Sequence, residues 1–334
     1  MKNSSPRIVV AGAGSIGCFV GGHLVAARHD VCFLARPRIA DELRQNGLTL
    51  SDRDDCTVRV AAKDLVIDTD PGVLASADVV LVTVKSGATR EMAASIRAFA
   101  PAHAIVVSLQ NGVDNATILQ EELPAIKVVA GMVPFNVVAL GEGHFHRASD
   151  GDVVVDAKIA ALAEALTTPH LTVATHADMR AVAWGKLLLN LNNALNALAG
   201  VPLREELAQR EWRRVLAACI AEALAALAAA GIRPARIGAL PPSLLPAVLR
   251  LPDALFKLVA AAQLRIDPSA RSSMWDDLEH RRTTEIDQLQ GAIVALAAKH
   301  GTTASMNLAV LERVKDAEKK GAGSPRLAAA ALLG

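Results

Sequence analysis

A lysine and two asparagines share one face of a predicted helix in the second half of the chain. They are Lys186, Asn190 and Asn193. A helix turns about 100° per residue, so these side chains fall within about 60° of one another, opposite a leucine-rich face. A solvent-exposed stripe is one interpretation. However, asparagine lowers helix propensity, and four asparagines in seven residues favour hydrogen bonds to a specific polar molecule.

The N-terminal region contains the pattern G-x-G-x-x-G between a predicted strand, 8–11, and a predicted amphipathic helix, 15–28. The six residues are Gly12, Ala13, Gly14, Ser15, Ile16 and Gly17. The first glycine permits a tight turn, the second lets a diphosphate approach the backbone, and the third lets the helix pack on the strand. Free amide groups and the helix dipole then attract the diphosphate. A glycine-rich turn alone is the alternative, but this context predicts dinucleotide binding.

The end of the second predicted strand indicates which dinucleotide binds. Arg36 follows the strand 31–34, and no Asp or Glu stands there to accept a hydrogen bond from a ribose 2′-hydroxyl. A guanidinium at this place can pair with a 2′-phosphate, and Arg38 can assist. A solvated loop arginine is the alternative. The sequence therefore predicts NADP rather than NAD.

Two polar residues follow other predicted strands. Lys85 comes after 79–84, and Asn111 comes shortly after 105–109. Ligands of doubly wound sheets bind beyond the carboxyl ends of the strands, so these residues are candidate cofactor or substrate contacts. The alternatives are a surface lysine and a turn dipeptide, with Asp114 capping the next helix.

A further polar segment, 272–287, combines a predicted helix start with acidic residues. Ser273 and Asp276 form a plausible capping pair, which is the structural alternative to a ligand-binding role for the serine. Glu285 is a candidate functional carboxylate. It could equally be an exposed helix residue paired with Arg281 or Arg282.

The elements that must position these residues differ between the two halves of the chain. The first half alternates apolar runs with helical segments, which predicts an α/β fold with a doubly wound parallel sheet of the Rossmann type. The predicted strands are 8–11, 31–34, 79–84, 105–109, 128–130 and 153–155, and the predicted helices are 15–28, 89–99 and 115–123. The second half is rich in Ala and Leu and predicts an all-helical domain. We expect an NADP-binding domain over 1–177, a helical domain over 178–325 that ends in a linker, 319–325, and a tail over 326–334.

Composition excludes several classes of function. The 334 residues include 35 basic and 34 acidic side chains, a net charge of +1, so a nucleic acid is not the expected partner. The four cysteines are scattered without ligand spacing and indicate a reducing compartment. His144 and His146 lack further ligands and are expected on one face of a strand rather than at a metal, so no metal site is predicted. No apolar segment is long enough to span a membrane, and the N-terminus lacks a signal sequence, so a cytoplasmic protein is expected.

Five motifs in this order resemble the ketopantoate reductases (2-dehydropantoate 2-reductases). They are GAGSIG, the lysine of TVKSG, the asparagine of LQNGVD, WGKLLLN, and the pair SSM and TEID. The resemblance covers residues 7 to about 290. It implies a Rossmann domain joined to a helical domain, and NADPH-dependent reduction of a 2-oxo acid, ketopantoate, to pantoate on the route to coenzyme A.

The resemblance also implies roles for individual residues. Lys186 matches the proton donor, Asn190 and Ser273 match substrate contacts, Glu285 matches a carboxylate near the cofactor, and Lys85 and Asn111 match nicotinamide-side contacts, the latter also touching substrate. The family commonly has a further asparagine eight residues after the lysine, where this chain has Ala194 with Asn193 beside it. Another family amide falls at Leu203 or Arg204.

Two other functions fit the same residues. One is NADPH-dependent reduction of another branched 2-oxo acid, and the other is a non-catalytic NADPH-binding sensor, since a fold does not fix a function. A sensor would not need the proton donor. The apolar helices of the second half could form a homodimer interface.

Overall fold

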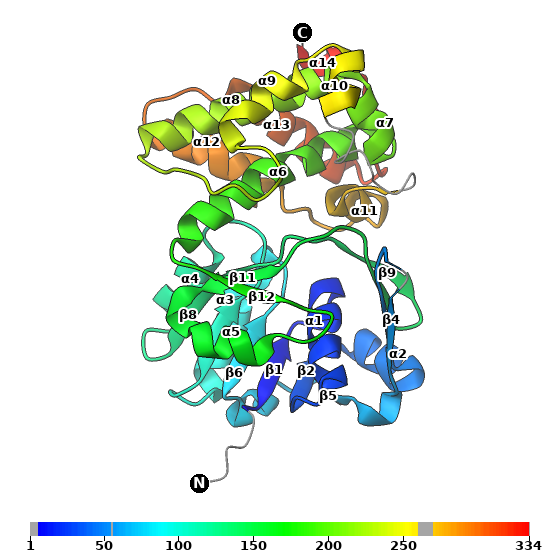
Figure 1. Cartoon of the computed structure of the whole chain (residues 1–334), viewed down its shortest axis with the longest axis vertical. Coiled ribbons are helices and arrows are strands. Elements are labelled where there is room, and N and C mark those ends of the chain that lie inside the picture. The colour runs from blue at the N-terminus through cyan, green and yellow to red at the C-terminus, as the bar shows by residue number, and fades with distance from the viewer. Residues whose placement is uncertain (1–5, 55, 260–269, 334) are drawn as a thin grey trace. The chain divides into compact units, whose positions relative to one another are not determined.

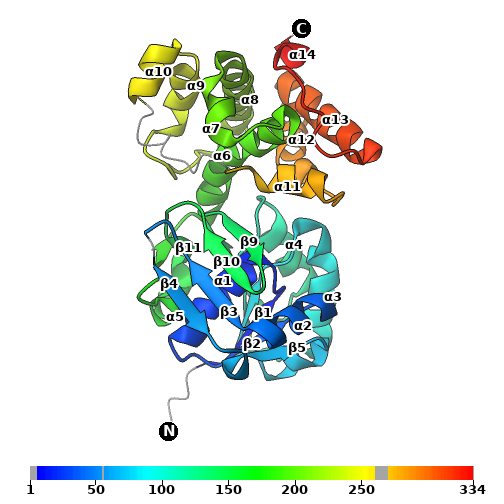
Figure 2. The same ribbon diagram turned by 90° about the vertical axis from the view of Figure 1, so that its right-hand side faces the viewer.

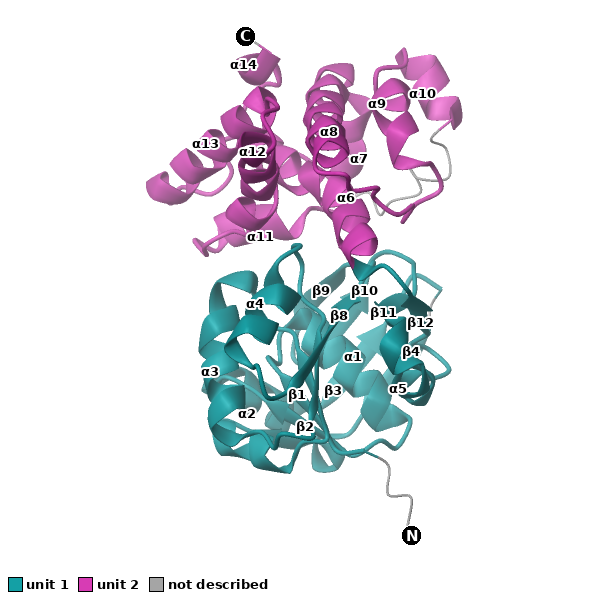
Figure 3. Cartoon of the chain, turned by 90° about the vertical axis from the view of Figure 1, so that its left-hand side faces the viewer, with its two compact units in different colours: residues 1–179 teal, residues 180–334 magenta. Residues whose placement is uncertain are grey.

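The computed structural model describes residues 6–54, 56–259 and 270–333. The chain divides into two compact units, residues 1–179 and 180–334 (Figure 3). Each unit has its own secondary structure, and each is described by itself below.

Unit 1 contains a large sheet, in which eight strands are found among the described residues (Figure 1). In spatial order they are β12 (Val173–His176), β11 (Val153–Asp156), β8 (Lys127–Met132), β7 (Ile105–Ser108), β6 (Val79–Val82), β1 (Ile8–Ala11), β2 (Val31–Leu34) and β5 (Val66–Asp68). The strands from β5 to β8 are parallel and follow the Rossmann order. The antiparallel pair β8 and β11 extends this sheet, and β12 pairs parallel to β11. The prediction of a Rossmann-type sheet is therefore confirmed.

The two faces of the sheet have separate apolar cores because side chains alternate along each strand. Ile8 and Val10 point to the face covered by α1 (Ser15–Ala26). Val9 and Ala11 point to the face covered by α3 (Thr89–Phe99) and α4 (Asn115–Glu122). This burial on both faces is the reason that the strands appear in the sequence as continuous runs of Val and Ile.

A second, smaller sheet was not predicted. Its strands in spatial order are β4 (Thr57–Val60), β3 (Leu48–Ser51), β10 (His144–Arg147) and β9 (Val137–Gly141) (Figure 2). Helix α1 contacts strands of both sheets and is buried around most of its circumference. The prediction of an amphipathic helix was therefore wrong, because no side of α1 is left for polar side chains.

Two consecutive glycines let α1 fit between the sheets. A Cβ at Gly21 would lie 2.5 Å from the Phe33 ring on the large-sheet side. A Cβ at Gly22 would lie 2.8 Å from Leu50 on the small-sheet side. Both distances are shorter than a carbon–carbon contact allows, so these positions accept only glycine without movement of the neighbour.

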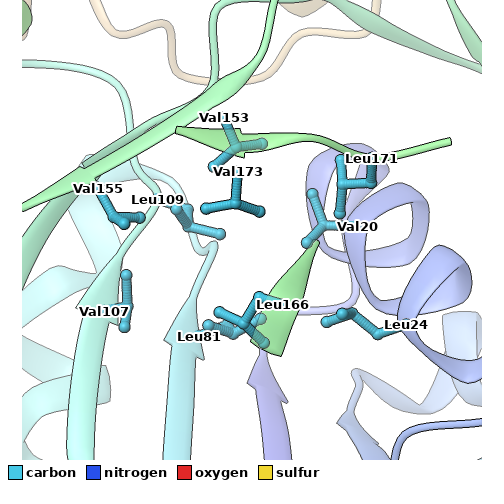
Figure 4. A pocket seen from close by; sticks show the side chains of 10 residues that line it. All are labelled: Val20, Leu24, Leu81, Val107, Leu109, Val153, Val155, Leu166, Leu171 and Val173. Atoms are coloured by element: carbon cyan, nitrogen blue, oxygen red, sulfur yellow. The ribbon is translucent and has the colours of Figure 1, made fainter. Parts of the chain in front are cut away.

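The remaining elements of unit 1 lie around the two sheets. They are the helices α2 (Pro37–Asn46) and α5 (Ala160–Leu166), and the 3₁₀ helices η1 (Ala62–Asp64), η2 (Pro71–Ser76), η3 (Ser86–Ala88) and η4 (Ala157–Ile159). Figure 4 shows a small cavity lined only by aliphatic side chains, among them Val20, Leu81 and Val155. It offers no polar group that could orient a ligand, so it belongs to the core.

Among its described residues, unit 2 consists of helices and connecting loops, without a strand. Its helices are α6 (Met179–Ala199, whose first residue belongs to unit 1), α7 (Leu203–Ala208), α8 (Arg210–Ala229), α9 (Leu245–Leu249), α10 (Asp253–Val259), α11 (Ser273–Glu279), α12 (Gln290–Lys299), α13 (Ser305–Lys320) and α14 (Ala330–Leu333), with the 3₁₀ helices η5 (Pro242–Leu244) and η6 (Ile286–Gln288). Helix α8 packs against α7, α9, α12 and α13. The predicted all-helical second half is confirmed.

A buried arginine connects four of these helices. Arg213 on α8 donates to the carbonyl oxygens of Leu207, at the end of α7, and of Leu249, at the end of α9. It also forms an ion pair with Asp253 of α10 at 2.6 Å. These bonds satisfy helix carbonyls that have no partner within their own helix.

The segment after α13 differs from the predicted linker. Lys319 and Lys320 still belong to α13, and the Ser324 hydroxyl donates to the carbonyl oxygen of Ala197 at 2.7 Å. The Leu327 amide donates to the carbonyl oxygen of Leu198 at 2.8 Å. The described C-terminal residues are therefore bonded to the end of α6.

Among the described residues, the helices are all too short or too polar to cross a lipid bilayer.

Candidate active site

The glycine turn of unit 1 has the geometry of a diphosphate cradle. Gly12 has a φ of +114°, and its amide donates to the carbonyl oxygen of Leu34 on β2. Gly14 begins α1 without a side-chain cap, and a Cβ there would have no atom within 4 Å. The chain therefore leaves space beside Gly14, where an anion can approach the start of α1.

Thr83 braces this turn and was missed by the sequence analysis. Its hydroxyl donates to the carbonyl oxygen of Gly12 at 2.6 Å. A Cβ at Gly17 would lie 2.2 Å from that carbonyl oxygen and 2.7 Å from the Thr83 hydroxyl. The third glycine of the motif thus lets α1 approach the end of β6, as its place in the pattern predicts.

Arg36 stands directly beyond β2, at the N-cap position of α2. Its side chain is exposed, and it forms no ion pair with any residue in the described part of the chain. Arg38, by contrast, lies 3.5 Å from Glu42 on the same helix. Of the two arginines, Arg36 is therefore the better candidate to bind the 2′-phosphate of a dinucleotide at the end of β2.

Lys85 and Asn111 lie in neighbouring loops at the carboxyl edge of the large sheet. Strand β6 ends at Val82, two residues earlier than predicted, so Lys85 lies in the loop before η3. Asn111 precedes Gly112, whose φ of +90° makes this a tight turn. Both side chains are exposed, and β6 and β7 are adjacent strands. The structure brings the two loops together.

A buried polar network joins these loops. The Asn115 amide donates to the Ser86 hydroxyl at 2.9 Å and to the carbonyl oxygen of Asn111. Thr89 donates to Asn115 at 2.8 Å, and Gln110 donates to Thr89 at 2.8 Å. Asp114 occupies the N-cap position of α4, as expected, but its side chain makes no capping hydrogen bond. Asn115 instead holds Ser86, the residue next to Lys85, and the main chain of Asn111.

In unit 2, the predicted stripe lies along α6. Asn190 is buried, whereas Lys186 and Asn193 are half-buried. Burial away from water lowers the pKa of the Lys186 ammonium to about 8. This value keeps the group protonated at neutral pH while making it a stronger acid than a free lysine.

The other two asparagines of the segment have a different partner. Asn192 and Asn196 both donate to the carboxyl group of Glu206 on α7, at 3.1 and 3.3 Å. Glu206 is fully buried, and burial raises the pKa of its carboxyl to about 8. The sequence gives little indication of this pairing, because Glu206 lies on a different helix, α7, from the two asparagines.

Ser273 is the first residue of α11, and its side chain is exposed. The predicted cap was wrong by one residue. Ser272 occupies the N-cap, and its hydroxyl accepts a bond from the Trp275 amide at 3.1 Å. The hydroxyl of Ser273 is therefore not used as the helix cap.

Glu285 lies in a turn just before η6 and is half-buried. The possibility that it is an exposed helix residue was wrong, because α11 ends at Glu279 and Arg281 then adopts a left-handed φ of +53°. Of the two arginines expected near Glu285, Arg282 forms an ion pair with another carboxylate, that of Asp277, at 3.8 Å.

The histidine pair of unit 1 shares one face of β10. His144 and His146 both bond to the Ser51 hydroxyl, at 2.8 and 2.9 Å, as expected for a strand. No group of three potential metal ligands occurs within residues 6–54, 56–259 and 270–333.

Comparisons with known proteins agree along nearly the whole chain. The family described as "Ketopantoate reductase PanE/ApbA" matches residues 8–158, and its C-terminal region matches residues 178–318. A 2-dehydropantoate 2-reductase of Halobacterium salinarum is 30% identical, over 94% of this chain and 100% of that protein. The chain belongs to the ketopantoate reductase family. It is accordingly an oxidoreductase of a family that uses a nicotinamide dinucleotide.

Solved structures show the fold of this ketopantoate reductase family member. A ketopantoate reductase of Ralstonia eutropha is 28% identical with a TM-score of 0.80, covering 94% of this chain and 99% of that one. A D-mandelate dehydrogenase, solved with NADH and anilino(oxo)acetate, is 21% identical with a TM-score of 0.76, covering 94% and 99%. At this identity the second likeness concerns the fold alone.

Proposed function

We propose that this protein reduces a 2-oxo acid to a 2-hydroxy acid with NADPH, and that the substrate is 2-dehydropantoate. The observation that carries the proposal is the half-buried Lys186, whose pKa is lowered to about 8, on the same face of α6 as Asn190 and Asn193. A stripe of this kind combines a proton donor with amides that can bind a polar acid. Family membership supports the reaction class.

The glycine turn fits a dinucleotide diphosphate. The open space over Gly14 and the uncapped first turn of α1 would accept it, and Arg36 would pair with a 2′-phosphate. NADPH supplies the hydride. Lys85 and Asn111, held by the Asn115 network, would contact the nicotinamide side.

Lys186 would supply the proton. Negative charge develops on the carbonyl oxygen of the substrate as C2 is reduced, and an ammonium within hydrogen-bond distance stabilises and then protonates that oxygen. Asn190, Asn193 and Ser273 would orient the acid. Glu285 would act as a carboxylate near the cofactor.

The test of this proposal is NADPH oxidation followed spectrophotometrically with 2-dehydropantoate and a panel of other branched 2-oxo acids. We expect Lys186→Ala to lower kcat about 10²–10⁴-fold, the usual contribution of a general acid. Its affinity for NADPH should stay within about twofold, a change of less than about 0.5 kcal/mol. Lys299→Ala, an exposed lysine at the end of α12, is the control and should match the parent. Turnover of Lys186→Ala within a few-fold of the parent would show that the proton comes from another group.

The panel also distinguishes the substrates. Ala194 stands where the family commonly has an asparagine, which favours a second candidate: reduction of another branched 2-oxo acid. A higher kcat/KM for such an acid would replace 2-dehydropantoate as the substrate. NADPH binding without oxidation by any acid would indicate the sensor instead.

The choice of cofactor is tested by Arg36→Ala. Loss of a charge-assisted hydrogen bond costs about 1.5–3 kcal/mol, so we expect roughly 10–100-fold weaker binding of NADPH and unchanged binding of NADH. Arg44→Ala, an exposed arginine of the same helix, is the control and should leave both affinities unchanged. Equal loss of both cofactors in Arg36→Ala would mean that the guanidinium does not recognise the 2′-phosphate.

A further inference from the structure

A buried polar cluster in unit 2 joins α6 to the start of α11. Its three central side chains, Asn196, Glu206 and Ser272, are at most 1% exposed. The side-chain oxygen Oδ1 of Asn196 accepts a bond from the main-chain amide of Ser272 at 2.9 Å. The Asn196 amide donates to Glu206 at 3.3 Å and to the carbonyl oxygen of Val201 at 2.9 Å. Asn196 thereby links the end of α6, the start of α7 and the start of α11.

Ser272 also bonds to a residue of the predicted substrate site. Its hydroxyl donates to the main-chain carbonyl oxygen of Asn193 at 2.9 Å and caps α11 through the Trp275 amide. Asn193 belongs to the Lys186 stripe, and Ser273 is the next residue after Ser272. One serine therefore connects the two segments that carry the predicted substrate contacts.

Hydrogen bonds fix the register of these helices more sharply than apolar packing does. The neighbouring side chains of α6, such as Leu195 and Leu198, are fully buried and apolar, and apolar contacts have no preferred direction. A hydrogen-bonded buried cluster has a defined geometry, because any shift leaves a polar group without a partner at a cost of about 1–3 kcal/mol. The cluster can thus set where α11 begins along α6.

We propose that Asn196, Glu206 and Ser272 are positioning residues, which hold the first turn of α11 against α6 so that Ser273 is placed beside Asn193 to bind the substrate. This inference rests on the proposed function, since it assumes that Ser273 and the Lys186 stripe contact one acid. Because all three side chains are buried, we assign them no contact with the reacting atoms.

The test compares Ser272→Ala with Ser272→Thr. Ser272→Ala removes both hydroxyl bonds, and we expect KM for the 2-oxo acid to rise roughly tenfold, as for one lost hydrogen bond of about 1.4 kcal/mol. The Kd for NADPH should stay within about twofold. Ser272→Thr keeps the hydroxyl and should restore KM. Ser305→Ala, an exposed serine in the first turn of α13, is the matched control and should leave KM unchanged.

A second pair of variants tests the carboxyl group. Glu206→Gln keeps an oxygen for Asn192 and Asn196 and should match the parent in KM, whereas Glu206→Leu removes that acceptor and should raise KM like Ser272→Ala. Should Glu206→Leu fail to fold, the Ser272 pair decides. A lower melting temperature in Ser272→Ala with an unchanged KM would show a purely structural role and overturn the proposal.

Failure of the proposed function would be seen separately. If the parent reduces no 2-oxo acid, that function is wrong, and hydrogen exchange of the Trp275 amide then tests the positioning. We expect faster exchange in Ser272→Ala and in Glu206→Leu than in Glu206→Gln. Equal exchange in all three variants would overturn the proposal without reference to activity.

Discussion

Lys186 has a pKa of about 8 because the folded chain removes its ammonium from water. In the proposed role of proton donor, the group acts in its protonated form. The rate of reduction should therefore be constant below this pKa and fall about tenfold per pH unit above it. We expect kcat/KM for NADPH-dependent reduction to show this decline with a midpoint near pH 8.

The measurement is a pH profile of kcat/KM, with NADPH affinity followed over the same range. A decline centred near 10.5, the ordinary value for lysine, would mean that the amine stays hydrated in the free protein. A profile without any decline would exclude Lys186 as the proton donor.

Single residues show where the sequence was informative and where it was not. The stripe of Lys186, Asn190 and Asn193 could be predicted, because helical spacing is a local property. The hydrogen bond between Asn196 and Glu206 could not, since Glu206 is brought in by the packing of α7. The cap of α11 was predicted one residue late, because Ser272 and Ser273 have the same side chain, and only the geometry distinguishes them.

The fit of α1 between the two sheets depends on the consecutive glycines Gly21 and Gly22, and Gly21 gives the sharper test. A Cβ there would lie 2.5 Å from the Phe33 ring and 2.9 Å from Val10, both in the core. Overpacking costs about 1–3 kcal/mol, which outweighs the helix propensity of about 1 kcal/mol that alanine adds. We expect Gly21→Ala to lower the melting temperature by several degrees.

Gly291→Ala in α12 is the matched control. The nearest atom to a Cβ there is at 3.6 Å, an ordinary contact, so only the propensity gain remains. Thermal unfolding should show an unchanged or slightly higher melting temperature for this variant. A Gly21→Ala protein as stable as Gly291→Ala would show that Phe33 moves aside freely.

Helix α1 also shows why the small sheet was not predicted from the sequence. Six of the eight strands of the large sheet were predicted, because burial on both faces leaves uninterrupted apolar runs. The edge strands β5 and β12, in which no residue is fully buried, were missed. Strands β3, β4, β9 and β10 are short and partly exposed, so they give no such signal. The sequence of α1 did contain a clue, because its residues are apolar on every side. A helix of this kind must be covered by other elements on more than one side.

Cofactor binding should stabilise the folded chain, since NADPH binds the native state and not the unfolded one. At a concentration 100 times Kd, this linkage adds about 2.7 kcal/mol to the free energy of unfolding. We expect NADPH to raise the melting temperature of the parent, and to raise that of Arg36→Ala less at the same concentration. The check is a thermal melt with and without NADPH, and no shift in the parent would contradict dinucleotide binding.

The chain passes from unit 1 to unit 2 once, at the start of α6. Every proposed cofactor contact except Glu285 precedes that crossing, and Lys186 follows it within two helical turns. Under the proposed function, preference for one dinucleotide and choice of acid would thus be encoded in largely separate stretches of the gene. A protein engineer could exchange the first stretch among relatives to change the source of reducing equivalents, while the lysine, its amide neighbours and the selectivity they confer are inherited intact.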